Sequence, residues 1–342
     1  MNARRTILPA ALLDALAEVG AKLARGDRIG SELDKALDLL ASVSPEQITR
    51  AEAEIVSAAD LNRWAPPPSL ETLFRTTDHK QLLRTPKLKY LFLFHRNGRI
   101  REAALMKLSK GLPNPFLFAA IAWRLNDWAE PVRQAAARCA RQCFPLTSPE
   151  VVARAAVTLL VRQTSWRRWG EERELLDQAF ARTDVAEHLF DALVRNATGP
   201  MPSVLQHALR TPALDPYLKR IAHEAVQPQV RAVALDLLIQ GRSEWPSGYG
   251  WQWLDKSLGL RQQVTTFGHR TLTVAVAKGE LIALGVRDRS AAVRRVALDG
   301  VMRHLLGTPE GREHAALLAA DRSSSVRERA EFILRDERRS LS

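Results

Sequence analysis

The chain of 342 residues is long enough for two or three average domains, or for one elongated repeat array. Its composition, 46% apolar and 26% charged, is that of an ordinary globular protein, which excludes global disorder, a collagen-like chain and a membrane channel. Only two cysteines are present, which excludes a disulfide-stapled secreted scaffold and favours a cytoplasmic protein, and the net charge of +12 suits a polyanionic partner.

The first part of the chain has the spacing of an amphipathic helix. Asp14 and Glu18 interrupt its apolar stretch, so the pattern favours a helix over a signal peptide. No apolar run approaches the ~20 residues needed to cross a bilayer, so no membrane association is expected. We predict that residues 1–64 form an N-terminal helical cap of about three helices, and that the prolines at 66–68 separate it from an array over residues 69–342.

From about residue 85 onward, a short pattern recurs: a polar or acidic start, then Val-Arg-x-x-Ala opening a helix. The motif arginines are Arg101, Arg133, Arg231, Arg294 and Arg327. They are separated by 32, 98, 63 and 33 residues, close to one, three, two and one multiples of a period near 32.5. This period predicts two short helices per repeat, with degenerate repeats filling the two longer gaps. An aspartate stands five residues before the valine in three copies, at Asp127, Asp288 and Asp321.

The D-x4-V-R-x-x-A signature resembles that of the HEAT-repeat superfamily in its short bacterial form, over roughly residues 85–340. The resemblance implies an all-α, right-handed α-solenoid of about seven or eight short helix pairs behind the cap. It also implies a structural ladder of the motif side chains. Arg133 would pair with Asp127 and Arg294 with Asp288, or each would pair with the equivalent residue of the adjacent repeat.

Two basic stretches are candidates for binding a partner or nucleic acid, because arginine beside tryptophan can stack on bases or pair with phosphates. They contain Trp166, Arg167, Arg168 and Trp169 in one stretch, and Lys87, Lys89, Arg96 and Arg99 in the other. The alternative is that long basic side chains cover solvated helix ends while the tryptophans anchor a distorted repeat.

A third cluster is aromatic and lies where the repeat pattern breaks, near residues 243–253, which we expect to be an insertion or loop. Its members are Trp245, Tyr249, Trp251 and Trp253. Such residues can form a docking surface for a partner, or they can seal the stack where the insertion interrupts it.

Candidate catalytic and metal-binding residues are few. Some HEAT-like proteins are DNA glycosylases that use tryptophans and an aspartate. Trp123 with Asp127 has a similar W-x3-D spacing, although Asp127 is equally explained as a repeat-turn residue.

Cys139 and Cys143, four residues apart, fit buried reduced thiols better than half a metal site. Neither a metal nor a cofactor is expected.

These patterns favour a non-catalytic HEAT-like scaffold or adaptor that binds a macromolecular partner, in the first place another protein. The alternative is a nucleic-acid-binding protein, including a DNA glycosylase of the HEAT-like type. The oligomeric state is left open.

Overall fold

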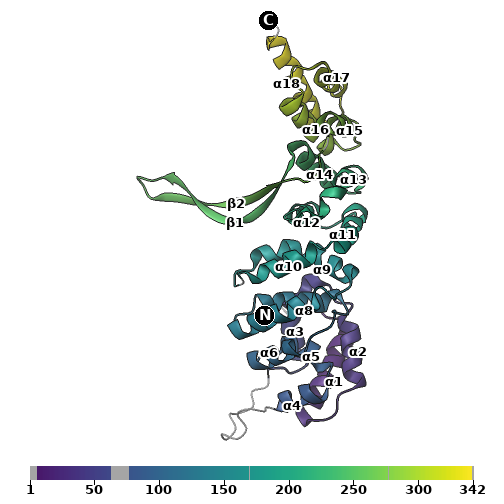
Figure 1. Ribbon diagram of the computed structural model, residues 1–342, viewed down its shortest axis with the longest axis vertical. Coiled ribbons are helices and arrows are strands. Elements are labelled where there is room, and N and C mark those ends of the chain that lie inside the picture. Colours follow the sequence, from purple (N-terminus) through teal and green to yellow (C-terminus); the bar gives the residue numbers. More distant parts are fainter. Residues whose placement is uncertain (1–5, 63–76, 169, 276, 341–342) are drawn as a thin grey trace. The chain divides into compact units, whose positions relative to one another are not determined.

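The computed structural model describes residues 6–62, 77–168, 170–275 and 277–340. Over these ranges the chain is mostly helical, with eighteen α-helices that pack in pairs and one antiparallel β-hairpin (Figure 1). Contacts divide it into two compact units, Met1–Phe180 (unit 1) and Ala181–Ser342 (unit 2). No helix among the described residues is long and apolar enough to span a membrane.

Unit 1 consists of short helices joined by turns. Its elements are α1 (Ala10–Arg25), α2 (Ser31–Leu40), η1 (Pro45–Gln47), α3 (Ile48–Ala58), α4 (Thr77–Arg84), α5 (Leu88–Leu91), η3 (Phe92–Phe94), α6 (Gly98–Met106), α7 (Pro115–Leu125), α8 (Glu130–Cys143), α9 (Pro149–Arg162), η4 (Gln163–Ser165) and α10 (Glu172–Phe180). The amphipathic helix predicted at the start of the chain is confirmed as α1, whose apolar side chains are buried. The proline boundary at 66–68 lies outside the described residues.

Helix α7 is the centre of unit 1. Its sequence is apolar on all sides, so it is buried around its whole circumference and packs against α3, α8 and α9. It begins at Asn114, whose side-chain oxygen accepts a hydrogen bond from the Leu117 N–H at 2.9 Å, and Pro115 occupies the first turn. These two signals fix where α7 starts, and its C-terminal end then carries Trp123, Arg124 and Asp127.

Unit 2 repeats one packing scheme. Its elements are α11 (Thr183–Arg195), α12 (Met201–Ala208), η5 (Pro212–Tyr217), α13 (Leu218–Glu224), α14 (Pro228–Gln240), β1 (Arg242–Asp255), β2 (Leu260–Thr271), α15 (Lys278–Val286), α16 (Ala291–His304), α17 (Pro309–Leu318) and α18 (Ser324–Ser340). The helices α14, α16 and α18, which carry the Val-Arg motif, pack in series, and α13, α15 and α17 each pack against the motif helix that follows.

The β-hairpin corrects the predicted all-α class, and we call it the arm (β1, the turn and β2, residues 242–271). In Figure 1 the arm extends away from the helices of unit 2. It begins after Gly241, whose φ of 72° ends α14, and the Leu272 N–H closes its base on the Gly241 carbonyl at 3.0 Å. The segment from Ser243 to Gly250, expected to be a loop or an insertion, forms part of β1.

The arm also corrects the repeat count between two motif copies. Arg231 and Arg294 are 63 residues apart, which suggested an intervening degenerate repeat. The structure instead places α14, the arm and one pair, α15 and α16, in this interval. Because the arm occupies residues 242–271, removing its thirty residues leaves 33, the same spacing that separates Arg294 from Arg327.

Candidate functional site

The motif arginines share one contact pattern. Each donates from Nη1 to the backbone carbonyl six residues earlier, at 2.7–2.9 Å, in the pairs Arg101–His95, Arg133–Asp127, Arg231–Ala225, Arg294–Asp288 and Arg327–Asp321. Three of them also hold the aspartate of the next turn through Nε and Nη2, in the pairs Arg101–Asp127, Arg231–Asp288 and Arg294–Asp321. The ladder prediction is therefore confirmed in its cross-repeat form.

Each of these aspartates also holds the turn that precedes the next helix. A carboxylate oxygen accepts the backbone N–H two residues later, at Ala129, Ser290 and Ser323. Burial opposes ionisation of Asp288, but hydrogen bonds from Arg231 and the Ser290 N–H outweigh it and lower the pKa of the carboxyl. The hydrogen bond from Arg294 likewise lowers the pKa of Asp321.

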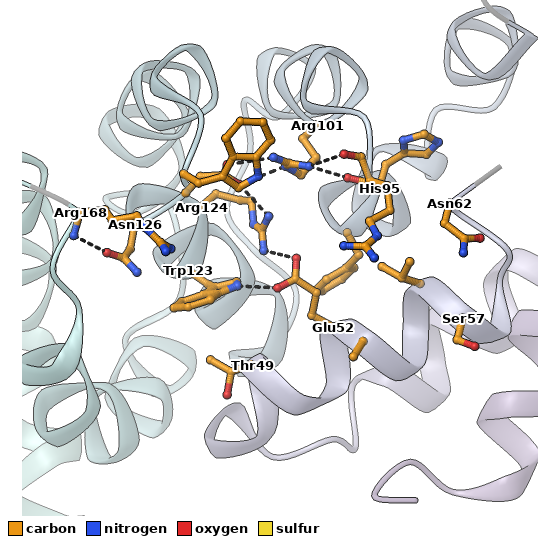
Figure 2. Close-up of a pocket in the computed structure, with 16 residues that line it drawn as sticks. Thr49, Glu52, Ser57, Asn62, His95, Arg101, Trp123, Arg124, Asn126 and Arg168 are labelled. Atoms are coloured by element: carbon orange, nitrogen blue, oxygen red, sulfur yellow. Dashed lines mark hydrogen bonds and ion pairs between the residues drawn. The ribbon is translucent and has the colours of Figure 1, made fainter. Parts of the chain in front are cut away.

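A pocket of about 610 Å³ opens in unit 1 beside the C-terminal end of α7 (Figure 2). Besides α7, its walls come from α3, from η3 and the segment that follows it, from α6, and from the loop that follows η4. Its polar and aromatic lining consists of Thr49, Glu52, Ser57, Asn62, Phe94, His95, Arg96, Arg101, Trp123, Arg124, Asn126, Asp127, Trp128 and Arg168.

Glu52 organises the floor of this pocket. Its Oε2 accepts a hydrogen bond from the Trp123 indole at 2.7 Å, and its Oε1 accepts one from Arg124 Nη2 at 2.5 Å (Figure 2). Arg124 Nη1 continues the network to Asp127 at 2.7 Å. The indole orientation is therefore fixed from α3. Sequence reasoning missed Glu52 because it lies 71 residues from Trp123 and belongs to no motif.

Asp127 is fully engaged in this network. Its side chain is 1% exposed and accepts four hydrogen bonds: two from Arg101, one from Arg124 and one from the Ala129 N–H. A carboxylate offers about four lone-pair positions, so these donors saturate it. Asp127 therefore holds the turn and the neighbouring guanidinium groups rather than presenting a free base to the pocket.

The mouth of the pocket brings the two predicted basic stretches together. Arg96 from the first stretch and Arg168 from the second both line it and are exposed, although they are 72 residues apart in the chain. The Arg168 N–H donates to Asn126 Oδ1 at 2.9 Å, which holds this loop beside α7. Trp128, at the same mouth, is 71% exposed.

The other predicted residues of the basic stretches lie elsewhere. Trp166 is buried and meets Trp123 edge-on with ring centres 5.4 Å apart, so it anchors the wall rather than offering a free face. Lys87 pairs with Asp34 at 2.7 Å, and that hydrogen bond raises the pKa of Lys87. The remaining three are Lys89, which donates to the Lys107 carbonyl, and the exposed Arg99 and Arg167. Trp169 lies outside the described residues.

The predicted aromatic cluster lies on β1 and divides into two parts. Tyr249, Trp251 and Trp253 are 68%, 59% and 50% exposed, and alternate positions of a strand share a face. Trp245 instead packs over Gly268 on β2, so closely that a Cβ at that glycine would come within 2.8 Å of the indole. Trp245 therefore belongs to the base of the arm, whereas the other three are exposed to solvent over half or more of their surface.

A buried ion pair anchors the base of the arm to unit 2. Arg270 on β2 donates to both oxygens of Asp215 at 2.6 and 2.9 Å, and the Asp215 side chain is fully buried. The N–H and hydroxyl of Thr273 donate to the same carboxylate. Burial opposes ionisation of Asp215, but these hydrogen bonds outweigh it and lower its pKa.

Both cysteines are free and buried, as predicted, with the two Sγ atoms 3.7 Å apart. Among the described residues, no group of three or more His, Cys, Asp or Glu side chains is arranged to hold a metal ion.

No protein-family model matches this chain, and no curated protein matches it.

Proposed function

We propose that this chain is a HEAT-like repeat protein that binds nucleic acid through the pocket of unit 1. The helix pairs are then the building blocks of a right-handed solenoid over residues 69–342, behind a cap formed by residues 1–64. The arginine–aspartate ladder supports this architecture, because one guanidinium fixes its own turn and the next one at a constant spacing.

One observation carries the choice of nucleic acid: one arginine from each of two basic stretches far apart in the chain lines a single pocket that also contains tryptophans. Arg96 and Arg168 at the mouth suit phosphate oxygens, whose neutralisation releases counterions and contributes affinity. Trp128 beside them offers a ring on which a base can stack. The saturated Asp127 supports binding rather than base excision.

The test is direct binding of fluorescein-labelled DNA, single-stranded and duplex, measured by fluorescence anisotropy at several salt concentrations. Reversing both charges, Arg96→Glu with Arg168→Glu, should weaken binding of the DNA. It should also reduce the magnitude of the slope of log affinity against log salt concentration by about 1.5, because two phosphate contacts are lost. The matched control is Lys110→Glu with Arg154→Glu, two exposed cations outside the pocket. Absence of binding by the native chain at low salt, or an equal loss in the control, would refute the proposal.

A scaffold for another protein is the second candidate function. The exposed aromatic side chains of the arm favour it, because tryptophan, tyrosine and arginine dominate the energetics of protein interfaces. Purification of the chain from its native cell with and without nuclease separates the two candidates. A defined protein that stays bound after nuclease treatment would support the scaffold.

A further inference from the structure

We infer that the arm binds single-stranded nucleic acid by stacking unpaired bases on one of its faces, the aromatic face (Tyr249, Trp251, Trp253 and Phe267). The inference rests on the proposed function for the class of partner, but it uses different residues in the other unit. The two can therefore fail separately.

The register of the hairpin defines this face. Tyr249, Trp251 and Trp253 lie opposite Thr265, Gln263 and Arg261, and the irregularity between Pro246 and Gly248 lies outside this stretch. Phe267 is two residues beyond Thr265 on the uninterrupted strand β2, so it shares the face, and it is 54% exposed. The opposite face of the same stretch carries one apolar side chain larger than a methyl group, Val264, among glycines and polar residues: Gly248, Gly250, Gln252, Gln262 and Thr266.

Exposure of four aromatic rings on one ribbon is unusual in a folded chain. A two-stranded hairpin in water is marginally stable by itself, and its apolar face normally packs against a helix or a third strand. Here the face is half or more exposed, and the arm extends away from the helices of unit 2 (Figure 1). Rings held in water in this way are available for a ligand that presents flat apolar surfaces.

The charges of the arm favour a phosphate-bearing partner over a second copy of this chain. Arg261 lies on the aromatic face, with its guanidinium carbon 4.4 Å from the centre of the Trp251 ring. Asp255 is occupied in the turn, where it accepts hydrogen bonds from Ser257 and the Leu258 N–H, and Glu244 lies at the base beside Arg242. Two chains of net charge +12 repel each other, whereas a phosphodiester strand is attracted to the arm.

The spacing of the rings favours a single strand over a duplex. Alternate residues of a strand are about 6.6 Å apart, roughly twice the 3.4 Å rise between stacked bases of a duplex strand. Consecutive bases of a duplex therefore cannot occupy consecutive rings. Unpaired bases can be splayed onto aromatic side chains one at a time, as sequence-tolerant single-strand binding requires.

The base of the arm holds this face ready for binding. Arg270 joins β2 to Asp215 and to the carbonyls of Leu209 and Thr211, and Ser243 joins β1 to the Leu209 carbonyl. Since these bonds exist before any ligand arrives, less conformational entropy is lost when the ligand binds.

The experiment measures binding of labelled dT15, U15 and a 15-base-pair duplex to the full chain. Trp251→Val with Trp253→Thr removes two rings but keeps residues that favour strands, so the arm stays folded. We expect affinity for dT15 and U15 to fall at least about 30-fold, with duplex binding changed less than about threefold. Trp251→Tyr with Trp253→Tyr retains rings and should preserve binding, and Phe332→Ala, which removes an exposed ring on α18, is the matched control.

Hydrogen exchange of residues 242–271 checks that the arm remains formed in the variants. Unchanged binding of dT15 and U15 by the variant Trp251→Val with Trp253→Thr overturns the inference about the arm. In that case the proposed function still stands if Arg96→Glu with Arg168→Glu weakens binding of nucleic acid. Loss of binding in the tyrosine variant with the arm intact also overturns the inference about the arm. A native chain that binds no nucleic acid overturns both proposals.

Discussion

At the scale of single residues, Arg231 shows how one side chain joins two turns. Its guanidinium is 1% exposed, Nη1 donates to the carbonyls of Ala225 and Val226, and Nε and Nη2 hold both oxygens of Asp288. The planar fork of arginine supplies these donors in a fixed geometry, which the single ammonium of lysine does not. The side chain therefore acts through shape as well as charge.

The variant Arg231→Lys tests this dependence on geometry. It keeps the positive charge but leaves part of a partly buried carboxylate and two backbone carbonyls without donors, so we expect a loss of about 2–4 kcal/mol in the free energy of unfolding. Urea titration followed by circular dichroism measures the loss. Arg289→Lys, at an exposed neighbouring position, should change the midpoint little. Equal midpoints for the two variants would show that the ladder contributes no geometry-dependent stability.

At the scale of elements, the attachment of the arm depends on one ionised carboxyl. The pKa of Asp215 is lowered in the folded chain, so its stabilising contribution is present above the unfolded value of about 3.9 and is lost as the pH falls through the folded value. Protonation would remove the charge that Arg270 neutralises. The arm should therefore loosen from unit 2 only in acid.

Asp215→Asn is expected to reproduce this loosening at neutral pH. An amide cannot neutralise Arg270, so hydrogen exchange at residues 241–245 and 268–273 should accelerate. The melting temperature should fall, and below pH 4 it should depend less on pH than that of the native chain, because the titrating carboxyl is gone. Exchange measured by mass spectrometry at pH 7 reports this directly. Asp191→Asn, at a more exposed pair with Arg195, is the matched control. An unchanged exchange rate at the base would contradict the anchoring role of Asp215.

The arm also shows which elements the sequence could predict. The motif helices were predictable because buried apolar residues recur at helical spacing, as in α14, α16 and α18. A loop or an insertion was predicted near residues 243–253, but its strand structure was missed because Pro246, Gly248 and Gly250 indicate a turn. The signal for a strand was the alternation of Tyr249, Trp251 and Trp253. The bond between Glu52 and Trp123 could not be predicted, since nothing in the local sequence connects α3 to the end of α7.

At the scale of the whole molecule, the question is how the net charge of +12 is used. Three of the ladder arginines, Arg101, Arg231 and Arg294, form ion pairs with aspartates, so these three contribute nothing to this surplus. If every surplus charge met a phosphate, the logarithm of affinity for a single strand would fall with the logarithm of salt with a slope of about −8. A strand bound at the pocket would meet Arg96 and Arg168, which predicts a slope of about −1.4, and a strand bound on the arm would meet Arg261, which predicts a slope of about −0.7.

Anisotropy titrations of dT15 between 50 and 300 mM salt separate these values. A slope between about −0.7 and −1.4, with substantial affinity remaining at high salt, is expected, because base stacking on the arm does not release counterions. Arg261→Gln should reduce the magnitude of the slope by about 0.7, whereas Arg154→Gln, at an exposed position on α9, should leave it unchanged. A slope near −8 that responds equally to both substitutions would mean that the chain attracts polyanions over its whole surface, and neither the pocket nor the arm would then be a defined site.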